Sequence, residues 1–227
     1  MSERLGIVYT PVEIVDFILN SVDGLLRAEF GQTLGSEGVH IIDPFTGTGT
    51  FITRLLQSGL ISRAELHRKY SKEIHANEIV LLAYYIAAIN IEAAYHGIVK
   101  GEYVPFEGIC LTDTFQLYEK DNLISRVLVD NGARRVRQRR LDIRVIVGNP
   151  PYSVGKDSQN DEGGNVAYPM LDARIASTYG ARSSAVNGRI LYDSYVRAIR
   201  WASDRVGSSG IVGFVTNANF VEVATAD

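Results

Sequence analysis

The chain has very little sulfur and no excess of positive charge. Its one cysteine, Cys110, cannot form a disulfide within the chain, which fits a reducing compartment such as the cytoplasm. Cys110 falls in an apolar, strand-like segment, so it is interpreted as a small buried hydrophobic residue. The formal net charge is −3 at pH 7, whereas a domain that binds DNA unaided normally carries a basic face. This charge argues against a stand-alone nucleic-acid binder.

Long apolar runs and targeting signals are also absent. The longest apolar run covers residues 79–89 and then meets Asn90 and Glu92, which makes it too short for a membrane span. It is interpreted as a helix buried between a sheet and its neighbours. The N-terminus lacks the charged and then apolar pattern of a signal peptide. With 46% hydrophobic and 22% charged residues, the sequence predicts one globular domain over residues 1–227, located in the cytoplasm and not at a membrane.

The most informative segment that is present is the tetrapeptide Asn149, Pro150, Pro151 and Tyr152, which directly follows an apolar run. Asparagine and two prolines cannot continue a strand ladder, so a buried strand is predicted to end in a rigid turn. The turn presents an amide, a backbone carbonyl and an aromatic face together. These groups suit a planar ring that carries an amino group, such as a nucleobase. The alternative is a rigid turn with no binding role.

A second segment, residues 43–50, has the sequence Asp-Pro-Phe-Thr-Gly-Thr-Gly-Thr and follows another apolar run. It predicts a strand, a glycine-rich turn and then a helix from about Thr50 to Gln57, with Gly47 and Gly49 letting the backbone approach a ligand closely. Ile52 occupies the third glycine position of the dinucleotide fingerprint, and no Gly-Lys-Ser/Thr follows as in a phosphate loop. A carboxylate at the strand end disfavours phosphate and favours an amine or ribose hydroxyls. The alternative is an ordinary nucleotide-type turn of an α/β fold.

Polar residues follow strand-like runs at intervals of about 35 residues, at Asp43, Glu78, Asp113 and Asn149. Strands are predicted at residues 40–42, 74–76, 108–111 and 145–147, with helices between them at 50–69, 79–96 and 117–132. A strand with its crossover helix takes about 30 residues, so the spacing predicts right-handed βαβ units and a parallel sheet. Ligands bind beyond the carboxyl ends of the strands in such sheets. The four polar side chains are therefore predicted to form one site.

Further elements flank this core. Thr10 and Pro11 are predicted to be the N-cap and first residue of an N-terminal helix. Residues 153–188 are irregular, with a short helix-like stretch around 171–179, and are too long for an ordinary connection. They are interpreted as a functional loop beside the turn at Asn149. A helix at residues 190–206 and a fifth strand at residues 211–215 are predicted to follow.

One arginine-rich run, residues 134–140, does not belong to these motifs. Because it precedes the strand that ends before Asn149, it is predicted to lie at the opposite edge of the sheet from the site. It is either a nucleic-acid contact or a solvated or interdomain surface.

Taken together, these motifs resemble the class I S-adenosylmethionine-dependent methyltransferases, and within them the N6-adenine DNA methyltransferases of the gamma motif order. In that order an opening cofactor motif and further cofactor motifs precede the catalytic motif. The segments similar to these motifs, in chain order, are residues 6–11, 43–50, 77–79, 112–115 and 149–152. Residues 191–205 and 210–220 further resemble large single-chain, type I-like (ISP) restriction–modification enzymes. Those enzymes fuse a nuclease, a helicase-like motor, a methyltransferase and a DNA-recognition domain.

The resemblance implies a doubly wound, Rossmann-like α/β fold with a mostly parallel sheet. It assigns a helix with a cofactor motif to residues 1–30, the cofactor-binding core to 38–150, and a loop insertion near the catalytic turn to 153–190. The family's sheet normally closes with a further helix and an antiparallel strand pair, followed by a target-recognition domain. We expect these to be missing here and the chain to be a truncated methyltransferase domain.

The resemblance also implies S-adenosylmethionine as the cofactor and no metal site. The expected cofactor-binding residues are Tyr9, Thr10, Pro11, Asp43, Pro44, Phe45, Gly47, Gly49, Thr50, Glu78, Ile79, Asp113 and Phe115. Asp43 is expected near the methionine end, Glu78 at the ribose hydroxyls and Asp113 at the adenine amino group. The corresponding alternatives are a helix cap, a solvated strand end and a turn former.

Two more sets of cofactor contacts are expected. Tyr9, Thr10 and Pro11 are expected at the methionine carboxylate, next to a helix N-terminus. Ile79 or Phe115 is expected to sandwich the cofactor adenine, with an ordinary core role as the alternative.

The expected catalytic residues are Asn149, Pro150, Pro151 and Tyr152. The Asn149 amide oxygen and the Pro150 carbonyl each accept an N–H of the target amine, and Tyr152 stacks on an adenine extruded from DNA. Double-stranded DNA is expected to bind weakly or not at all without a recognition domain. The rival functions are a protein-glutamine or RNA-base methyltransferase, and a cofactor-binding fragment that is inactive alone.

Overall fold

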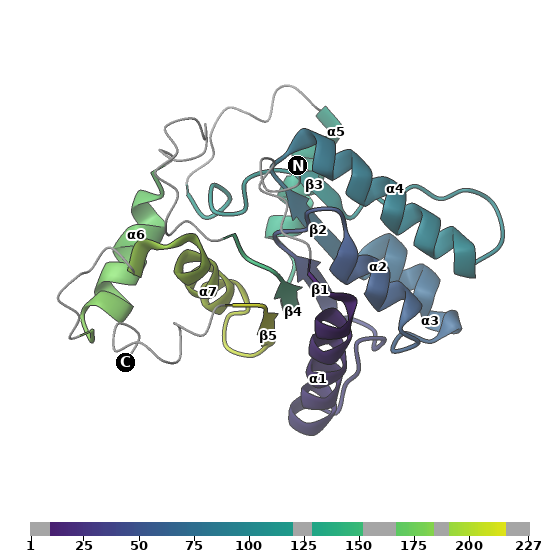
Figure 1. Cartoon of the computed structure of the whole chain (residues 1–227), viewed down its shortest axis with the longest axis horizontal. Coiled ribbons are helices and arrows are strands. Elements are labelled where there is room, and N and C mark those ends of the chain that lie inside the picture. The colour runs from purple at the N-terminus through teal and green to yellow at the C-terminus, as the bar shows by residue number, and fades with distance from the viewer. Residues whose placement is uncertain (1–9, 120–128, 152–166, 184–190, 217–227) are drawn as a thin grey trace.

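The computed structural model describes residues 10–119, 129–151, 167–183 and 191–216, and within them the chain forms one parallel sheet (Figure 1). The strands are β1 (His40–Asp43), β2 (Ile74–Glu78), β3 (Ile109–Leu111), β4 (Ile143–Gly148) and β5 (Ile211–Phe214), in the order β3-β2-β1-β4-β5. Each pairing is parallel. The chain builds outwards from β1 to β3 and then returns to β4 on the other side of β1. The switch point therefore lies between β1 and β4, where ligands of such sheets bind.

The strand register brings the carboxyl ends of the strands to one edge. Asp43 is opposite Ala76, Glu78 is opposite Leu111, and Gly148 is opposite Phe214. The residues that leave each strand are consequently neighbours in space.

Helices cover both faces of the sheet (Figure 1). On one face lie α1 (Val12–Phe30), α2 (Thr50–Gln57) and α4 (Leu81–Ile98); on the other lie α6 (Pro169–Ile175) and α7 (Ser194–Arg205). Side chains alternate along a strand, so Ile41 of β1 joins the core beneath α1, α2 and α4, while Ile42 joins Leu171 and Trp201 beneath α6 and α7. The sheet thus separates two cores, and the predicted doubly wound α/β fold is confirmed.

The predicted helix at residues 50–69 is divided in the structure. It begins as α2 but stops at Gln57, and α3 (Arg63–Arg68) starts after a turn in which Gly59 has φ 79°. Ser62 and Glu65 form a capping box that starts α3, with the Ser62 N–H donating to Glu65 Oε2 at 3.0 Å. A π-helical turn, Lys69–Glu73, then leads into β2.

The predicted helix at residues 117–132 is matched only in part, because residues 120–128 lie outside the described residues. Residues 117–119 are not helical, and the described helix that precedes β4, α5 (Val129–Arg139), extends beyond residue 132. Asn131 joins α5 to β3, because its side chain exchanges hydrogen bonds with the Leu111 main chain at 2.8 and 2.9 Å. These contacts cross 20 residues of sequence, so helix periodicity alone did not locate α5.

The arginine-rich run falls on α5 and just beyond it. Arg137 reaches Glu107, which precedes β3, at 3.8 Å. Asp113 follows the same strand, so the run lies at the opposite edge from the site, as predicted. The other predicted elements shift little. Helix 79–96 is α4, helix 190–206 is α7, strand 211–215 is β5, and stretch 171–179 is α6 followed by a π-helical turn, Ala176–Gly180.

Across the described ranges, no helix combines the length and the apolar character that a membrane crossing requires. In the same ranges, no three His, Cys, Asp or Glu side chains gather in a way that would hold a metal ion.

Candidate cofactor and catalytic site

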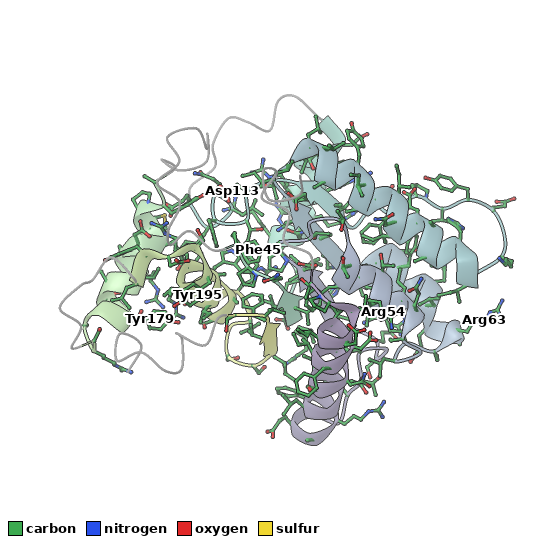
Figure 2. The ribbon with its side chains drawn as sticks, viewed as in Figure 1. Phe45, Arg54, Arg63, Asp113, Tyr179 and Tyr195 are labelled. Atoms are coloured by element: carbon green, nitrogen blue, oxygen red, sulfur yellow. The ribbon has the colours of Figure 1, made fainter. Side chains whose placement is uncertain are left out.

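A cleft of about 360 Å³ opens at the carboxyl edge of the sheet. The loops that follow β1, β2, β3 and β4 line it, together with Thr10, Tyr168 and Ser194. In Figure 2, Phe45 and Asp113, which both line this cleft, lie between the sheet and α6. The predicted residues that line the cleft are Thr10, Pro44, Phe45, Gly47, Thr50, Glu78, Ile79, Asp113, Phe115, Asn149, Pro150 and Pro151.

Some predicted residues do not line the cleft. Tyr9 and Tyr152 lie outside the described residues, and Pro11 and Gly49 contribute nothing to its wall. Asp43 lies beneath the floor, 1% exposed, where its Oδ1 accepts the Phe45 N–H at 3.0 Å. Burial, with a further contribution from the nearby Glu78 carboxylate, raises the pKa of Asp43 to about 8. Asp43 therefore stabilises the turn, and its predicted contact with the methionine end stays a prediction.

The two glycines of the turn do different things. Gly49 has φ 89°, and a Cβ atom there would lie 3.3 Å from Ala87 Cα of α4. Gly47 has φ 56°, and a Cβ atom there would have no other atom within 4 Å. Gly47 thus leaves room for a ligand, as the sequence suggested for both glycines. Gly49 instead allows the start of α2 to pack closely against α4.

Glu78, at the end of β2, is 8% exposed and organises this turn. Its Oε2 accepts the Gly47 N–H at 2.7 Å, and its Oε1 accepts the Val80 N–H at 2.7 Å. Burial raises the pKa of Glu78. The carboxylate that the sequence assigned to ribose recognition is therefore held with both oxygens in fixed positions on the cleft wall.

Neighbouring loops are locked together by Asn77 and Thr114, two cleft residues that the sequence analysis did not assign. Asn77 Nδ2 donates to Thr114 Oγ1 at 3.2 Å, and Thr114 Oγ1 donates to the Pro44 carbonyl at 2.6 Å. The Thr46 N–H donates to the Asn77 carbonyl at 3.0 Å. No donor from the described residues reaches the buried Asn77 Oδ1. Since Asn77 lines the cleft, this oxygen is a buried acceptor beside the cleft.

At the far end of the cleft, Asp113 is held from two sides. Its Oδ1 accepts the Phe115 N–H at 2.9 Å, and its Oδ2 accepts the Tyr168 hydroxyl at 2.8 Å. Phe115 is 5% exposed and packs on Phe45 with ring centroids 5.4 Å apart, so much of its surface belongs to the core. Ile79 is 61% exposed at the mouth of the cleft and offers an apolar face to a ligand.

Asn149 is joined to the start of α1. Its Nδ2 donates to Thr10 Oγ1 at 3.1 Å. The helix begins one residue later than predicted, with Pro11 at the N-cap and no side-chain capping bond. The prediction of Thr10 as N-cap is therefore wrong, because the Thr10 hydroxyl instead accepts a hydrogen bond from the turn at Asn149. This bond turns the Asn149 amide oxygen away from Thr10.

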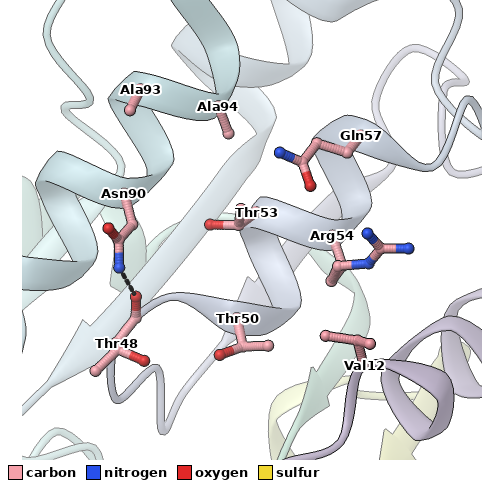
Figure 3. A pocket seen from close by; sticks show the side chains of 9 residues that line it. All are labelled: Val12, Thr48, Thr50, Thr53, Arg54, Gln57, Asn90, Ala93 and Ala94. Atoms are coloured by element: carbon pink, nitrogen blue, oxygen red, sulfur yellow. Dashed lines mark hydrogen bonds between the residues drawn. The ribbon is translucent and has the colours of Figure 1, made fainter. Parts of the chain in front are cut away.

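A second pocket lies behind the glycine-rich turn, between α2 and α4 (Figure 3). Asn90 of α4 donates from Nδ2 to the Thr48 carbonyl at 2.9 Å. Thr48 and Thr50 line this pocket as well as the cleft at the carboxyl edge of the sheet, so Asn90 supports the turn from its rear side. The remaining lining residues are Val12, Thr53, Arg54, Gln57, Ala93 and Ala94.

Solved structures of restriction–modification enzymes are similar to this chain. The first is described as "ATP-dependent Type ISP restriction-modification enzyme LlaBIII bound to DNA"; it is 48% identical, with a TM-score of 0.91 over 99% of this chain and 16% of that one. The second is a nuclease-deletion mutant of the type ISP enzyme LlaGI in complex with a DNA substrate mimic; it is 49% identical, with a TM-score of 0.90 over 97% of this chain and 19% of that one. The third, a DrdV–DNA complex, is 45% identical, with a TM-score of 0.90 over 99% of this chain and 22% of that one.

The chain thus spans between 16 and 22% of the length of these three proteins. The predicted resemblance to the methyltransferase part of type ISP enzymes is confirmed. Comparison with curated proteins gives no match. Residues 1–173 match the family described as N-6 DNA Methylase, and they include the turn at Asn149 and every residue that lines the cleft except Ser194. The chain belongs to the N-6 DNA methylase family.

Proposed function

We propose that this chain binds S-adenosylmethionine in the cleft and transfers its methyl group to the N6 amino group of an adenine in DNA. We further propose that it does so as the methyltransferase part of a restriction–modification enzyme. One observation carries the proposal: a single cleft at the switch point is lined by the strand-end acids Glu78 and Asp113 and by Asn149 and Pro150. The two acids can accept hydrogen bonds from the ribose hydroxyls and the adenine amino group of the cofactor. The Asn149 amide oxygen and the Pro150 carbonyl can accept hydrogen bonds from the amino group of the target base.

The cleft fits this cofactor in space and in charge. Gly47 leaves open space beside the turn, and the buried Asn77 Oδ1 offers an acceptor. Burial raises the pKa of Glu78 and Asp43, so a cation nearby would favour their ionised forms and would itself be stabilised. S-Adenosylmethionine is a sulfonium compound, and when bound it supplies an electrophilic methyl group.

Each part of the cofactor has a proposed partner. Glu78 would hold the ribose hydroxyls, and Asp113 the adenine amino group. Ile79 would cover one face of the adenine. The N-terminal end of α1, beside Thr10, would receive the methionine carboxylate, because free backbone N–H groups there favour an anion.

Asn149 and Pro150 would position the target amine. That amine is a weak nucleophile because its lone pair is delocalised into the purine ring. The Asn149 amide oxygen and the Pro150 carbonyl would each accept one N–H, which orients the amine and favours a pyramidal nitrogen with a localised lone pair. Thr10 fixes the Asn149 amide, and the two prolines limit movement of the backbone. The contribution is orientation and electrostatics, with no strong base needed before attack.

The target base would have to leave the helix to reach this turn. Tyr152, which lies outside the described residues, is proposed to stack on the extruded base. Because the net charge of the chain is −3, we propose that most DNA contacts come from other parts of a longer protein. The similar solved structures, which are described as bound to DNA or to a DNA substrate mimic, support this view.

Calorimetric titration with S-adenosylmethionine tests the cofactor half of the proposal. Glu78→Gln should weaken binding at least ten-fold, because it removes a charged acceptor of two hydroxyls (on the order of 1.5 to 3 kcal/mol per bond). Glu37→Gln, an exposed acid before β1, is the matched control and should bind like wild type. A folded wild-type chain that does not bind would contradict the proposal.

Transfer of labelled methyl groups to duplex DNA, RNA and protein tests the second half. Asn149→Ala should bind cofactor nearly as wild type does and should lose transfer to DNA. Labelling of RNA or of protein glutamine in place of DNA would assign the chain to a rival methyltransferase class. Loss of cofactor binding in Asn149→Ala would contradict the role given to Asn149.

A further inference from the structure

Tyr168 reaches Asp113 from a distant part of the chain. It directly precedes α6, whereas Asp113 follows β3, and 55 residues of sequence separate them. The Tyr168 hydroxyl donates to Asp113 Oδ2 at 2.8 Å, and both residues line the cofactor cleft. No motif of the sequence included Tyr168.

The Tyr168 ring is fixed before any ligand arrives. It meets Phe115 edge to face, with centroids 5.2 Å apart, and the Arg197 guanidinium lies 5.3 Å from its centroid. Arg197 is itself held by Asp172 through two bonds of 2.8 and 3.0 Å. A ring held by such contacts loses little entropy when it makes a hydrogen bond.

The segment that carries Tyr168 is also anchored. The Glu119 carboxylate accepts the Met170 and Leu171 N–H groups at 3.0 Å, which caps the start of α6 from outside the helix. Tyr168 therefore adjoins a helix end that is tied to the loop after β3. The distance between Tyr168 and Asp113 is set by the fold and not by a flexible side chain.

The hydroxyl is a permanent donor at working pH. Burial, reinforced by the adjacent Asp113 carboxylate, raises the pKa of Tyr168 well above its ordinary value. Asp113 Oδ2 is thereby kept in one orientation, while Oδ1 is kept by the Phe115 N–H. An exocyclic amino group of a purine bound here could donate to either of the two Asp113 carboxylate oxygens, which are held in place. A purine with an oxo group at the same position would face their lone pairs.

We propose that Tyr168 is a positioning residue for purine selectivity: by holding Asp113 Oδ2, it lets the cleft prefer a 6-amino purine over a 6-oxo purine at the cofactor's base. The inference rests on the proposed function, because it assumes that the cleft takes S-adenosylmethionine. It adds a residue and a specificity that the cofactor motifs do not contain.

The test compares the dissociation constants of S-adenosylhomocysteine and S-inosylhomocysteine, which carries the 6-oxo purine. Wild type should prefer the amino compound by about 100-fold or more, because the oxo group cannot donate to the Asp113 carboxylate and sets its own lone pairs against those of the carboxylate oxygens. Tyr168→Phe keeps the ring contacts and removes only the hydroxyl. It should weaken the amino compound about ten-fold and leave the oxo compound unchanged, so that the preference falls.

Tyr179→Phe is the matched control. Tyr179 follows α6, and its ring takes a similar contact from Arg200 at 5.5 Å, but it does not line the cleft. This variant should bind both compounds as wild type does. A merely structural role of Tyr168 would instead weaken both compounds equally.

Other outcomes overturn the inference. Unchanged preference in Tyr168→Phe, equal weakening of both compounds, or tighter binding of the amino compound would each contradict it. Failure of the proposed function looks different, since a folded wild-type chain would then bind neither compound. If S-adenosylhomocysteine binds and Glu78→Gln weakens it while Tyr168→Phe does nothing, only the role of Tyr168 is wrong.

Discussion

Asn149 and Thr10 are hydrogen-bonded at 3.1 Å although 139 residues separate them in sequence. The bond joins the residue after β4 to the residue before the N-cap of α1, and it spans the switch point of the sheet. It ties the turn proposed for catalysis to the helix end proposed for the methionine carboxylate.

Thr10→Val removes the hydroxyl while keeping the shape of the side chain. We expect methyl transfer at saturating cofactor to slow by about ten-fold, because the Asn149 amide is no longer held in one orientation. The dissociation constant of the cofactor should change little. Thr10→Ser should retain the wild-type rate. If Thr10→Val transfers methyl groups normally, the bond has no part in positioning Asn149.

Asp43→Asn should change how stability depends on pH. The pKa of Asp43 in the folded chain is about 8, above the ordinary 3.8 of an aspartate, so the folded state keeps a proton that the unfolded state has lost. Stability from this group is complete below pH 4 and falls as pH rises towards 8, by up to about 1.4 kcal/mol per pH unit. The amide that replaces the carboxyl cannot titrate, so the variant should gain stability over wild type as pH increases.

Urea unfolding at pH 5.5 and 7.5 measures this difference. Asp130→Asn, an exposed substitution on α5, supplies the control and should follow the pH dependence of wild type. Parallel behaviour of Asp43→Asn and wild type would show that the carboxyl is ionised in the folded chain.

Cofactor binding should release protons near neutral pH. The cationic sulfonium of S-adenosylmethionine favours the ionised forms of Glu78 and Asp43, whose pKa values burial has raised, and so it lowers those pKa values. Calorimetry at pH 7 in buffers of different ionisation enthalpy counts the protons. S-Adenosylhomocysteine, which lacks the positive charge, should release fewer. Equal proton release with both compounds would show that the sulfonium charge does not change the ionisation of these two acids.

Gly47→Ala and Gly49→Ala should have different consequences. Both positions have positive φ, which costs an alanine about 1 to 2 kcal/mol. A methyl group at Gly49 also meets the α4 backbone at 3.3 Å, so Gly49→Ala should lose more stability in urea unfolding. A methyl group at Gly47 enters open space at the cleft, so Gly47→Ala should weaken cofactor binding more. The reverse ranking in either measurement would contradict the division of roles.

Asn90→Asp removes the donor that supports the glycine-rich turn from behind. Loss of the bond to the Thr48 carbonyl should loosen the turn and weaken cofactor binding several-fold. Amide hydrogen exchange of the turn should quicken. Asn20→Asp is the matched control, because Asn20 also donates to a backbone carbonyl, at 2.8 Å, but lies on the exposed side of α1. Equal rates of amide hydrogen exchange in the turn of both variants would show that Asn90 does not support it.

Much of the fold could be predicted from the sequence because the features that specify it lie close together along the chain. The strands apart from β2 are short, mainly apolar runs, and a polar residue or a rigid turn closely follows each of the first four. The regular spacing of Asp43, Glu78, Asp113 and Asn149 therefore predicted the parallel sheet. The end of α2 at Gln57 was predicted, but the longer helix-like stretch at residues 50–69 did not separate α3, although Gly59 and the capping box of Ser62 and Glu65 mark the break in the sequence.

Part of the site could not be predicted because it depends on contacts across the fold. Tyr168 meets Asp113 across 55 residues, Asn90 meets Thr48 across 42, and Asn77 meets Thr114 across 37. Residue type alone did not single out any of these side chains. The position of α5 has the same origin, since Asn131 joins that helix to β3 across 20 residues.

The division of the interior by the sheet gives one half of the molecule an optical reporter of its own. Trp201, the single tryptophan, is 4% exposed in the core beneath α6 and α7. Tyrosines lie in both cores, because Tyr70 and Tyr95 stack 3.7 Å apart in one and Tyr168 and Tyr179 pack against the other. Indole fluorescence therefore follows the α6 and α7 side alone, whereas tyrosine absorbance follows both sides. Coincident unfolding curves from the two signals would mean that both halves melt as one cooperative unit.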